Sequence, residues 1–275
     1  MLRVDEERKI PGGVEIKANV IDREIVRSVL DGPHREKFFN PLRDGENTTA
    51  RLKTLHEQWK EQHVTTVFTS GVFDLMHLNH AAFLVQVKLE AAPFHFAKYH
   101  AGVLAPTWDD LSEAEKRAYC LRLLERGDLK LIVSVDGDAA VAVRKRDKGG
   151  GERPIYSWET RASDVLRLTI ETEPGSFTTV VDAVTIHDDQ TPALYGTAHD
   201  SIMSIGHFLQ PNVWPVYSES RDILDDLEGR DAGDFPATQI VVMSPYEYYT
   251  DALLGGKFST TKIATRLGGA AVSQV

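Results

Sequence analysis

The sequence has a single cysteine and no apolar run long enough to cross a membrane. Cys120 stands alone among 275 residues, so no disulfide can form within the chain. No stretch approaches the roughly 18 apolar residues that a membrane-spanning helix needs, and the start, MLRVDEERK, lacks the apolar core of a secretory signal. These absences argue against a membrane protein and against a disulfide-linked secreted domain. We therefore expect a protein of the reducing cytoplasm.

The chain also lacks an excess of positive charge. Its 31 basic and 41 acidic residues give a formal net charge of −10. This balance argues against broad nucleic-acid binding, which requires a basic face. Small phosphorylated ligands need only a few local cations, and the most basic stretch, RKRDK at 144–148, is either such a site or a solvated loop.

The pattern of the remaining chain predicts an α/β fold. With 42% hydrophobic residues, the chain can bury one large core. From residue 64 onward, β-rich runs alternate with helical patterns, which favours a doubly wound, Rossmann-like parallel sheet. The predicted strands are 65–69, 129–135, 179–186, 212–216 and 239–243. Ligands of such sheets collect at the carboxyl ends of the strands, near the point where strand order reverses.

We expect two parts in the chain. Residues 1–63 carry mixed charge and predicted helices at 22–30 and 48–62, and should form an N-terminal extension packed on the core. Residues 64–275 should form the core domain, with a helical insertion at about 91–127.

The insertion carries clear helix signals. Ser112 and Glu115 predict a capping box, and Gly127 predicts the end of an amphipathic helix in which Cys120 packs rather than reacts. The preceding residues 92–108 are rich in aromatics and histidines. They form either a lid or acceptor pocket, or an anchor that holds the insertion to the core.

The most informative stretch is TTVFTSGVFDLMHLNHAAFL at 65–84. It predicts a buried strand, a tight turn permitted by Gly71, and then a helix. His77 and His80 therefore lie at a helix N-terminus, where unpaired backbone N–H groups favour anions. Two imidazoles there predict phosphate chemistry, although an isolated pair also fits a metal site or two solvated side chains. Zinc is disfavoured because a second cysteine and the Glu of the helical zinc-protease motif are both absent.

This stretch resembles the signature of the cytidylyltransferase-like nucleotidyltransferases, Gly-x-Phe-Asp-x-x-His-x-Gly-His. The one departure is Asn79, which stands where the family usually has glycine. The resemblance implies that His77 and His80 are catalytic and that Asp74 buttresses the turn. It also implies that the nucleotide is bound by Thr69, Ser70, Gly71, Val72, Phe73 and Asp74.

A second segment, 134–161, resembles the phosphate-binding region of heptose-1-phosphate adenylyltransferases and glycerol-3-phosphate cytidylyltransferases. The match implies that Lys148 is a catalytic phosphate clamp. The extra glycine in 149–151 keeps Lys145 as an alternative. Further residues that the resemblance implies for binding the acceptor or phosphate are Asp136, Arg153 and Arg161.

A third segment, FSTTKI at 258–263, resembles the Ile-Ser-Thr-Ser/Thr element at the start of a late helix in this family. The match implies that Ser259, Thr260 and Thr261 hold triphosphate oxygens, although helix capping alone would explain Ser259. The arginine that often precedes this element is missing, and Lys257 stands near its place. After the fourth predicted strand the chain reads NVWPVYSESRD and lacks the family's Gly-Asp pair, which leaves the nucleobase open.

A polar run, His187, Asp188 and Asp189, follows the predicted third strand. It could imitate a metal cluster, but a turn ended by Thr191-Pro192 is the commoner explanation, and we predict no metal held by the protein alone.

Together, the three resemblances imply transfer of a nucleoside monophosphate from CTP or ATP to a phosphorylated or phosphonate small molecule, with release of pyrophosphate. They imply Mg²⁺ bound with the triphosphate, and a homodimer is common in the family. Two alternatives remain open. One is a ligase similar to pantothenate synthetase, which acts through an acyl-adenylate, and the other is a nucleotide-binding protein with weak or no turnover.

Overall fold

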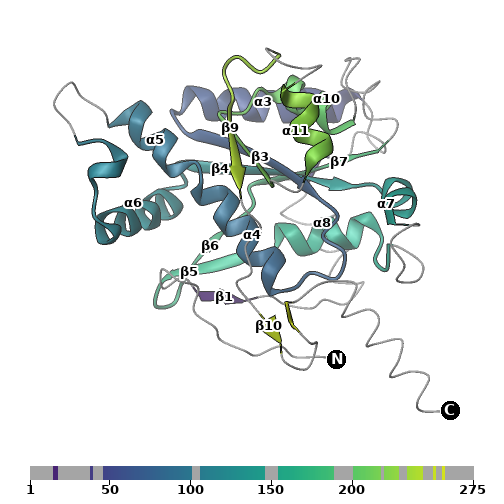
Figure 1. Ribbon diagram of the computed structural model, residues 1–275, viewed down its shortest axis with the longest axis horizontal. Helices are drawn as coiled ribbons and strands as arrows, with labels where there is room; N and C mark the ends of the chain where they lie inside the picture. Colours follow the sequence, from purple (N-terminus) through teal and green to yellow (C-terminus); the bar gives the residue numbers. More distant parts are fainter. Residues whose placement is uncertain are drawn as a thin grey trace.

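A parallel sheet of six strands lies at the centre of the structure (Figure 1). In spatial order the strands are β2 (Phe38–Phe39), β7 (Ala183–His187), β4 (Leu129–Asp136), β3 (Thr65–Gly71), β8 (Val213–Tyr217) and β9 (Gln239–Met243). Every neighbouring pair is parallel. The computed structural model describes residues 15–17, 38–39, 46–100, 106–145, 154–188, 201–217, 220–228, 234–243, 250–251 and 256–257.

Helices cover both faces of this sheet (Figure 1). One face packs against α4 (Leu78–Leu89) and α8 (Trp158–Leu166), whose buried cluster also includes α5 (Ala92–Tyr99) and α6 (Glu113–Arg126). The other face packs against α3 (Glu46–Glu61), α10 (Ser201–Leu209) and α11 (Arg221–Glu228). Because both faces are buried, β3 and β4 are buried along almost their whole length. The packing is close: a Cβ added at Gly206 of α10 would overlap the ring of Trp214 on β8.

The order of the strands fixes where a ligand can bind. The chain passes from β3 to β4 to β7 in one direction across the sheet, and then crosses to β8 and β9 on the other side of β3. Strand order therefore reverses between β3 and β8. In sheets of this kind the crevice outside the carboxyl ends of those two strands receives the ligand.

The predicted Rossmann-like sheet is confirmed, with one strand corrected. The predicted run 179–186 is two strands, because β6 (Ser176–Thr179) ends before β7 begins at Ala183. Between them Asp182 accepts hydrogen bonds from Lys88 Nζ at 2.7 Å and from the Leu131 N–H at 3.0 Å. These contacts hold the connection at the edge of the sheet.

A second, antiparallel sheet has the order β1-β5-β6, which sequence reasoning did not predict. β1 (Glu15–Lys17) pairs with β5 (Thr169–Glu173), which in turn pairs with β6. The N-terminal segment thus contributes β1 to this sheet, β2 to the edge of the main sheet, and α3 to its face. The predicted helix at 22–30 lies outside the described residues. A two-stranded ladder joins β10 (Thr250–Asp251) and β11 (Gly256–Lys257).

The insertion folds as predicted around its capping box. The Ser112 hydroxyl accepts a hydrogen bond from the Glu115 N–H at 3.3 Å, and Glu115 accepts one from the Ser112 N–H at 2.8 Å. Gly127 ends α6 in the left-handed conformation, with φ of 68°. Cys120 is partly buried against the core, and burial raises the pKa of its thiol to about 11, as expected for a packed cysteine.

The described parts of the insertion lie at one end of the main sheet. α4 starts at the carboxyl end of β3 and runs back along the sheet, and α6 leads directly into the first residue of β4. The described parts of the insertion therefore lie at the amino ends of the strands, on the far side from α7 (Asp138–Lys145) in Figure 1. Phe96 and Tyr119 are buried in the core. Of the two interpretations of residues 92–108, the described aromatic residues favour an anchor that holds the insertion to the core, and residues 101–105 lie outside the described residues.

No helix among the described residues is both long enough and apolar enough to span a bilayer.

Candidate active site

The loop after β3 brings both histidines to the reversal point of the sheet. β3 ends at Gly71, and His77 is the N-cap of α4, with φ of −140° and ψ of 171°. Its side chain makes no capping hydrogen bond. The first intrahelical bond of this turn runs from the Ala81 N–H to the His77 carbonyl at 3.1 Å. The N–H groups that precede it have no intrahelical partner, which makes this helix end suited to an anion.

The two imidazole rings lie against each other. The ring centroids of His77 and His80 are 3.8 Å apart and the planes differ by 17°. Burial lowers the pKa of His77 to about 4, so this ring is neutral at pH 7. A neutral imidazole still carries one N–H donor, and the orientation of the ring decides which acceptor that N–H can reach. The pair therefore offers directed hydrogen bonds, and an anion bound beside it would raise the pKa of His77.

The Phe73 ring explains why a glycine is needed at position 71. The Phe73 ring is buried and folds back over the strand end, where a Cβ added at Gly71 would lie 2.9 Å from two of its carbons. The same ring makes an edge contact with His80, with centroids 5.7 Å apart. Gly71 is thus needed for close approach of an aromatic ring. The unusual backbone lies further along the loop, where Phe73 and Leu75 have φ of 50° and 52°.

Asp74 is a buried residue that joins two loops. Its side chain accepts hydrogen bonds from the Ile155 N–H and the Tyr156 N–H, each at 3.0 Å. Asp74 is 2% exposed. The buttressing role expected for Asp74 therefore reaches beyond its own turn, to the backbone that precedes α8.

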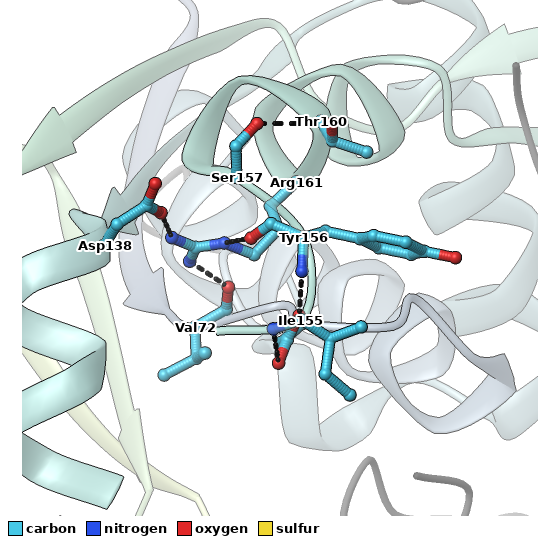
Figure 2. Close-up of polar contacts among 8 residues, drawn as sticks. Val72, Asp138, Ile155, Tyr156, Ser157, Thr160 and Arg161 are labelled. Carbon is cyan, nitrogen blue, oxygen red and sulfur yellow. Dashed lines mark hydrogen bonds and ion pairs between the residues drawn. The ribbon is translucent and has the colours of Figure 1, made fainter. Parts of the chain in front are cut away.

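Arg161 of α8 has no exposed surface, and its guanidinium is held by three protein acceptors (Figure 2). It donates from Nη1 to the Val72 carbonyl at 2.7 Å, from Nη2 to Asp138 Oδ1 at 2.7 Å, and from Nε to the Tyr156 carbonyl at 3.1 Å. The resemblance implied that Arg161 binds a phosphate. In this structure the Arg161 guanidinium forms an ion pair with Asp138 instead, and no part of Arg161 is exposed to a ligand.

Asp136 is likewise buried, at the end of β4. Its Oδ1 lies 3.1 Å from Nε2 of His187, and Nδ1 of His187 lies 2.8 Å from the Ser134 hydroxyl. All three residues are 1% exposed or less. His187, one of three polar residues that could have imitated a metal cluster, is thus part of an interstrand polar chain. In the described part of the protein, no group of three or more His, Cys, Asp or Glu is placed to hold a metal ion.

The other predicted residues divide between the strand end and the part of the chain that is not described. Thr69 is buried within β3, whereas Ser70, Gly71 and Val72 are partly exposed at its end. Lys148, Arg153, Ser259, Thr260 and Thr261 lie outside the described residues, as does the side chain of Lys145 at the end of α7.

Sequence reasoning missed two contributors to this edge. Asp138, which lies in the segment 134–161 and was assigned no role from the sequence, is the ion-pair partner of Arg161. Tyr217, the last residue of β8, stacks on Phe83 of α4 with centroids 4.7 Å apart and planes 25° apart. The rule that ligands gather at strand ends would have singled out Tyr217, because it ends the strand on the other side of the reversal point.

Comparisons with known proteins add little to this geometry. No family model matches the sequence, and no curated protein matches it. Among solved structures, the chain is similar to the lipopolysaccharide core biosynthesis protein from Thermoplasma volcanium GSS1, with 16% sequence identity and a TM-score of 0.36. The match covers 66% of this chain and 98% of that chain. A likeness this distant carries no argument about function.

Proposed function

We propose that this protein transfers a nucleoside monophosphate from CTP or ATP to a phosphate or phosphonate oxygen of a small-molecule acceptor. One observation carries the proposal. Two stacked imidazoles, His77 and His80, lie at the N-terminus of α4, which begins where the central strand β3 ends. This position is the reversal point of the sheet, and the helix end suits a phosphate.

In the proposed reaction, an acceptor oxygen attacks the α-phosphorus of the nucleotide. A new phosphorus–oxygen bond forms, the bond from the α-phosphorus to the bridging oxygen breaks, and pyrophosphate leaves with that electron pair. No covalent enzyme intermediate is required. The enzyme contributes alignment and stabilisation of the charge that builds on the transferring group.

The chain's own residues supply donors for that charge. Imidazole N–H groups of His77 and His80 and the first N–H groups of α4 would bond the α-phosphate oxygens. Lys148 would draw the acceptor towards the triphosphate, and Ser259, Thr260 and Thr261 would hold the β- and γ-phosphates. The partly exposed end of β3, Ser70 and Gly71, and the next residue, Val72, would line the nucleotide.

Magnesium enters this proposal as part of the substrate, the Mg–nucleotide complex. Mg²⁺ prefers phosphate oxygens and water to an all-protein cage. The carboxylates of Asp74 and Asp136 are buried and turned to protein partners, and imidazoles are poor ligands for this ion. The described residues therefore do not suit a resident Mg²⁺ site.

Calorimetric titration of the protein with Mg-ATP and with Mg-CTP tests the proposal. We expect one nucleotide to bind selectively, and pyrophosphate to be released when phosphorylated acceptors are screened with it. Binding of neither nucleotide would overturn the proposal. Amine-dependent release of AMP would identify an acyl-adenylate ligase, and selective binding without pyrophosphate release from any acceptor would identify a binding protein.

A further inference from the structure

Two buried charged side chains, Arg161 and Asp74, hold the backbone of the loop from Val72 to His77 in place through hydrogen bonds. Arg161 bonds the carbonyl of Val72, which lies just before Phe73, and Asp74 follows Phe73 directly. Asp74 bonds the N–H groups of Ile155 and Tyr156, while the Tyr156 carbonyl accepts from Arg161. The Ile155–Tyr156 turn is therefore held by both residues, and it ties the loop to α8 (Figure 2).

The loop needs such support because its backbone is strained. Phe73 and Leu75 both adopt left-handed φ angles, a conformation that disfavours residues with a side chain. Strain of this kind persists where surrounding contacts over-determine the backbone, and it clusters at functional sites. Here the contacts come from the Val72 carbonyl on one side and the Asp74 carboxylate on the other.

We propose that Arg161 is a positioning residue of the nucleotide site, which acts with Asp74 and Asp138 to hold the loop from Val72 to His77 in its binding conformation. The proposal rests on the proposed function for its ligand, and it gives Arg161 a different role from that of a phosphate ligand. The guanidinium fork meets three acceptors in fixed directions, whereas a lysine ammonium is a single point charge. Lysine at this position would keep the charge but lose the fork.

The test compares Arg161→Lys with Arg167→Lys, the same substitution at the end of the same helix. Among the described residues, Arg167 Nη1 has no hydrogen-bond partner, and Arg167 forms no hydrogen bond to Val72 or Asp138. Each variant is examined by hydrogen–deuterium exchange of the amides at 71–78, by thermal unfolding, and by titration with Mg-ATP and Mg-CTP.

We expect Arg161→Lys to fold, to exchange its loop amides faster than the wild type, and to bind nucleotide at least about tenfold more weakly, the change expected when a buried charged hydrogen bond is lost. Arg167→Lys should match the wild type in loop exchange and affinity. Unchanged loop exchange in Arg161→Lys would overturn the positioning role, and weaker binding with unchanged exchange would assign Arg161 a direct ligand contact.

Two further outcomes of this experiment have their own interpretation: misfolding of Arg161→Lys, and a wild type that binds neither nucleotide. If Arg161→Lys does not fold, Asp138→Ala removes one of the three acceptors from a partly exposed position at the start of α7, and unchanged loop exchange in this variant would overturn the role. If the wild type binds neither nucleotide, the proposed function fails, whereas loop exchange still decides whether Arg161 positions the loop.

Discussion

The structure contains two groups of histidines packed among aromatic rings, one at each edge of the main sheet. At the carboxyl edge, His77 stacks on His80, which touches Phe73. At the amino edge, His95 of α5 packs beside Tyr99 and lies 2.8 Å through Nδ1 from the Tyr119 hydroxyl. Burial lowers the pKa of both His77 and His95 to about 4.

Because both histidines share this pKa shift, burial alone does not single out His77 as the candidate catalytic histidine. His77 is the N-cap of a helix, next to N–H groups that have no partner within the helix, at the reversal point of the strand order. His95 lies inside a helix at the opposite edge and is bonded within the core. Perturbed ionisation occurs in structural clusters as well as in active sites. The position of the side chain in the fold distinguishes the two groups.

The largest expected contrast lies between His80→Ala and His95→Ala. His80→Ala should lower turnover by roughly 100-fold or more while leaving stability nearly unchanged, because it removes a donor to the transferring phosphate. His95→Ala should lower the free energy of unfolding by about 1–3 kcal/mol, because the buried Tyr119 hydroxyl loses its partner. Pyrophosphate release and urea unfolding measure the two effects. Wild-type turnover in His80→Ala would remove the basis for the assignment.

Two glycines, one in the core and one at the candidate site, should differ in whether their substitution affects stability or nucleotide binding. Gly206→Ala places a methyl group against Trp214 in the core and should cost about 1–3 kcal/mol or more of stability, as overpacking commonly does. Gly71→Ala should displace the Phe73 ring that touches His80, and should therefore weaken nucleotide binding. Urea unfolding and nucleotide titration of both variants provide the check. The distinction fails if Gly206→Ala weakens binding as much as Gly71→Ala in folded protein.

The pH dependence of stability should reflect the buried histidines. The folded-state pKa of His95 is about 4 and its unfolded value about 6.5, so between these values the unfolded chain binds a proton that the folded chain does not. This term is absent above pH 6.5 and lowers stability as the pH falls towards 4, by up to about 1.4 kcal/mol per pH unit. Asp164 has the opposite effect, because burial raises its pKa from 3.8 to about 7. Between these values the folded chain binds a proton that the unfolded chain does not, so this group raises stability as the pH falls.

A variant isolates the His95 contribution. His95→Gln should reduce the slope of unfolding free energy against pH between 4 and 6.5, measured by urea unfolding at fixed pH values. His63→Asn alters an exposed histidine outside α5, whose charge is not among the causes of the lowered His95 pKa, and serves as the control. An unchanged slope in His95→Gln would contradict the buried, neutral state of this ring.

The smallest effect concerns helix caps at the two edges. Ser112→Ala removes the hydroxyl of a formed capping box on α6 and should cost about 1 kcal/mol of stability without changing nucleotide affinity. Ser157 stands at the N-cap of α8 but makes no capping hydrogen bond, so Ser157→Ala should cost less. Thermal unfolding compares the pair. Equal losses would show that the hydroxyl of Ser112 contributes nothing through its bond.

Local signals in the sequence predicted most of the main sheet. The strand β9 has the predicted bounds, and the signals at Ser112 and Gly127 correctly mark the ends of α6. Such features depend on neighbouring residues and on the spacing of apolar side chains. The strands β1 and β2 were missed because they have three and two residues, and their pairing partners are distant in the sequence.

The candidate site was predictable in its location but only partly in the roles of its side chains. The paired histidines and Asp74 follow the central strand, as expected. The family resemblance implied that Arg161 and Asp136 bind the acceptor or phosphate. Their partners, Val72 and His187, come from other strands and loops, and no local pattern shows that a charged side chain will turn inward. Burial and direction are properties of the assembled fold.

The pairing of the first strands also constrains the route by which this chain folds. Glu15 of β1 pairs with Glu171, and Phe38 of β2 pairs with Val184. During synthesis, each of these early segments must wait for a partner that leaves the ribosome more than a hundred residues later. Contacts so far apart along the chain slow folding, because the loop between them must close before the pairing stabilises it. Closure of the β7 edge by β2 is therefore expected among the late steps of folding, after β3 and β4 have paired.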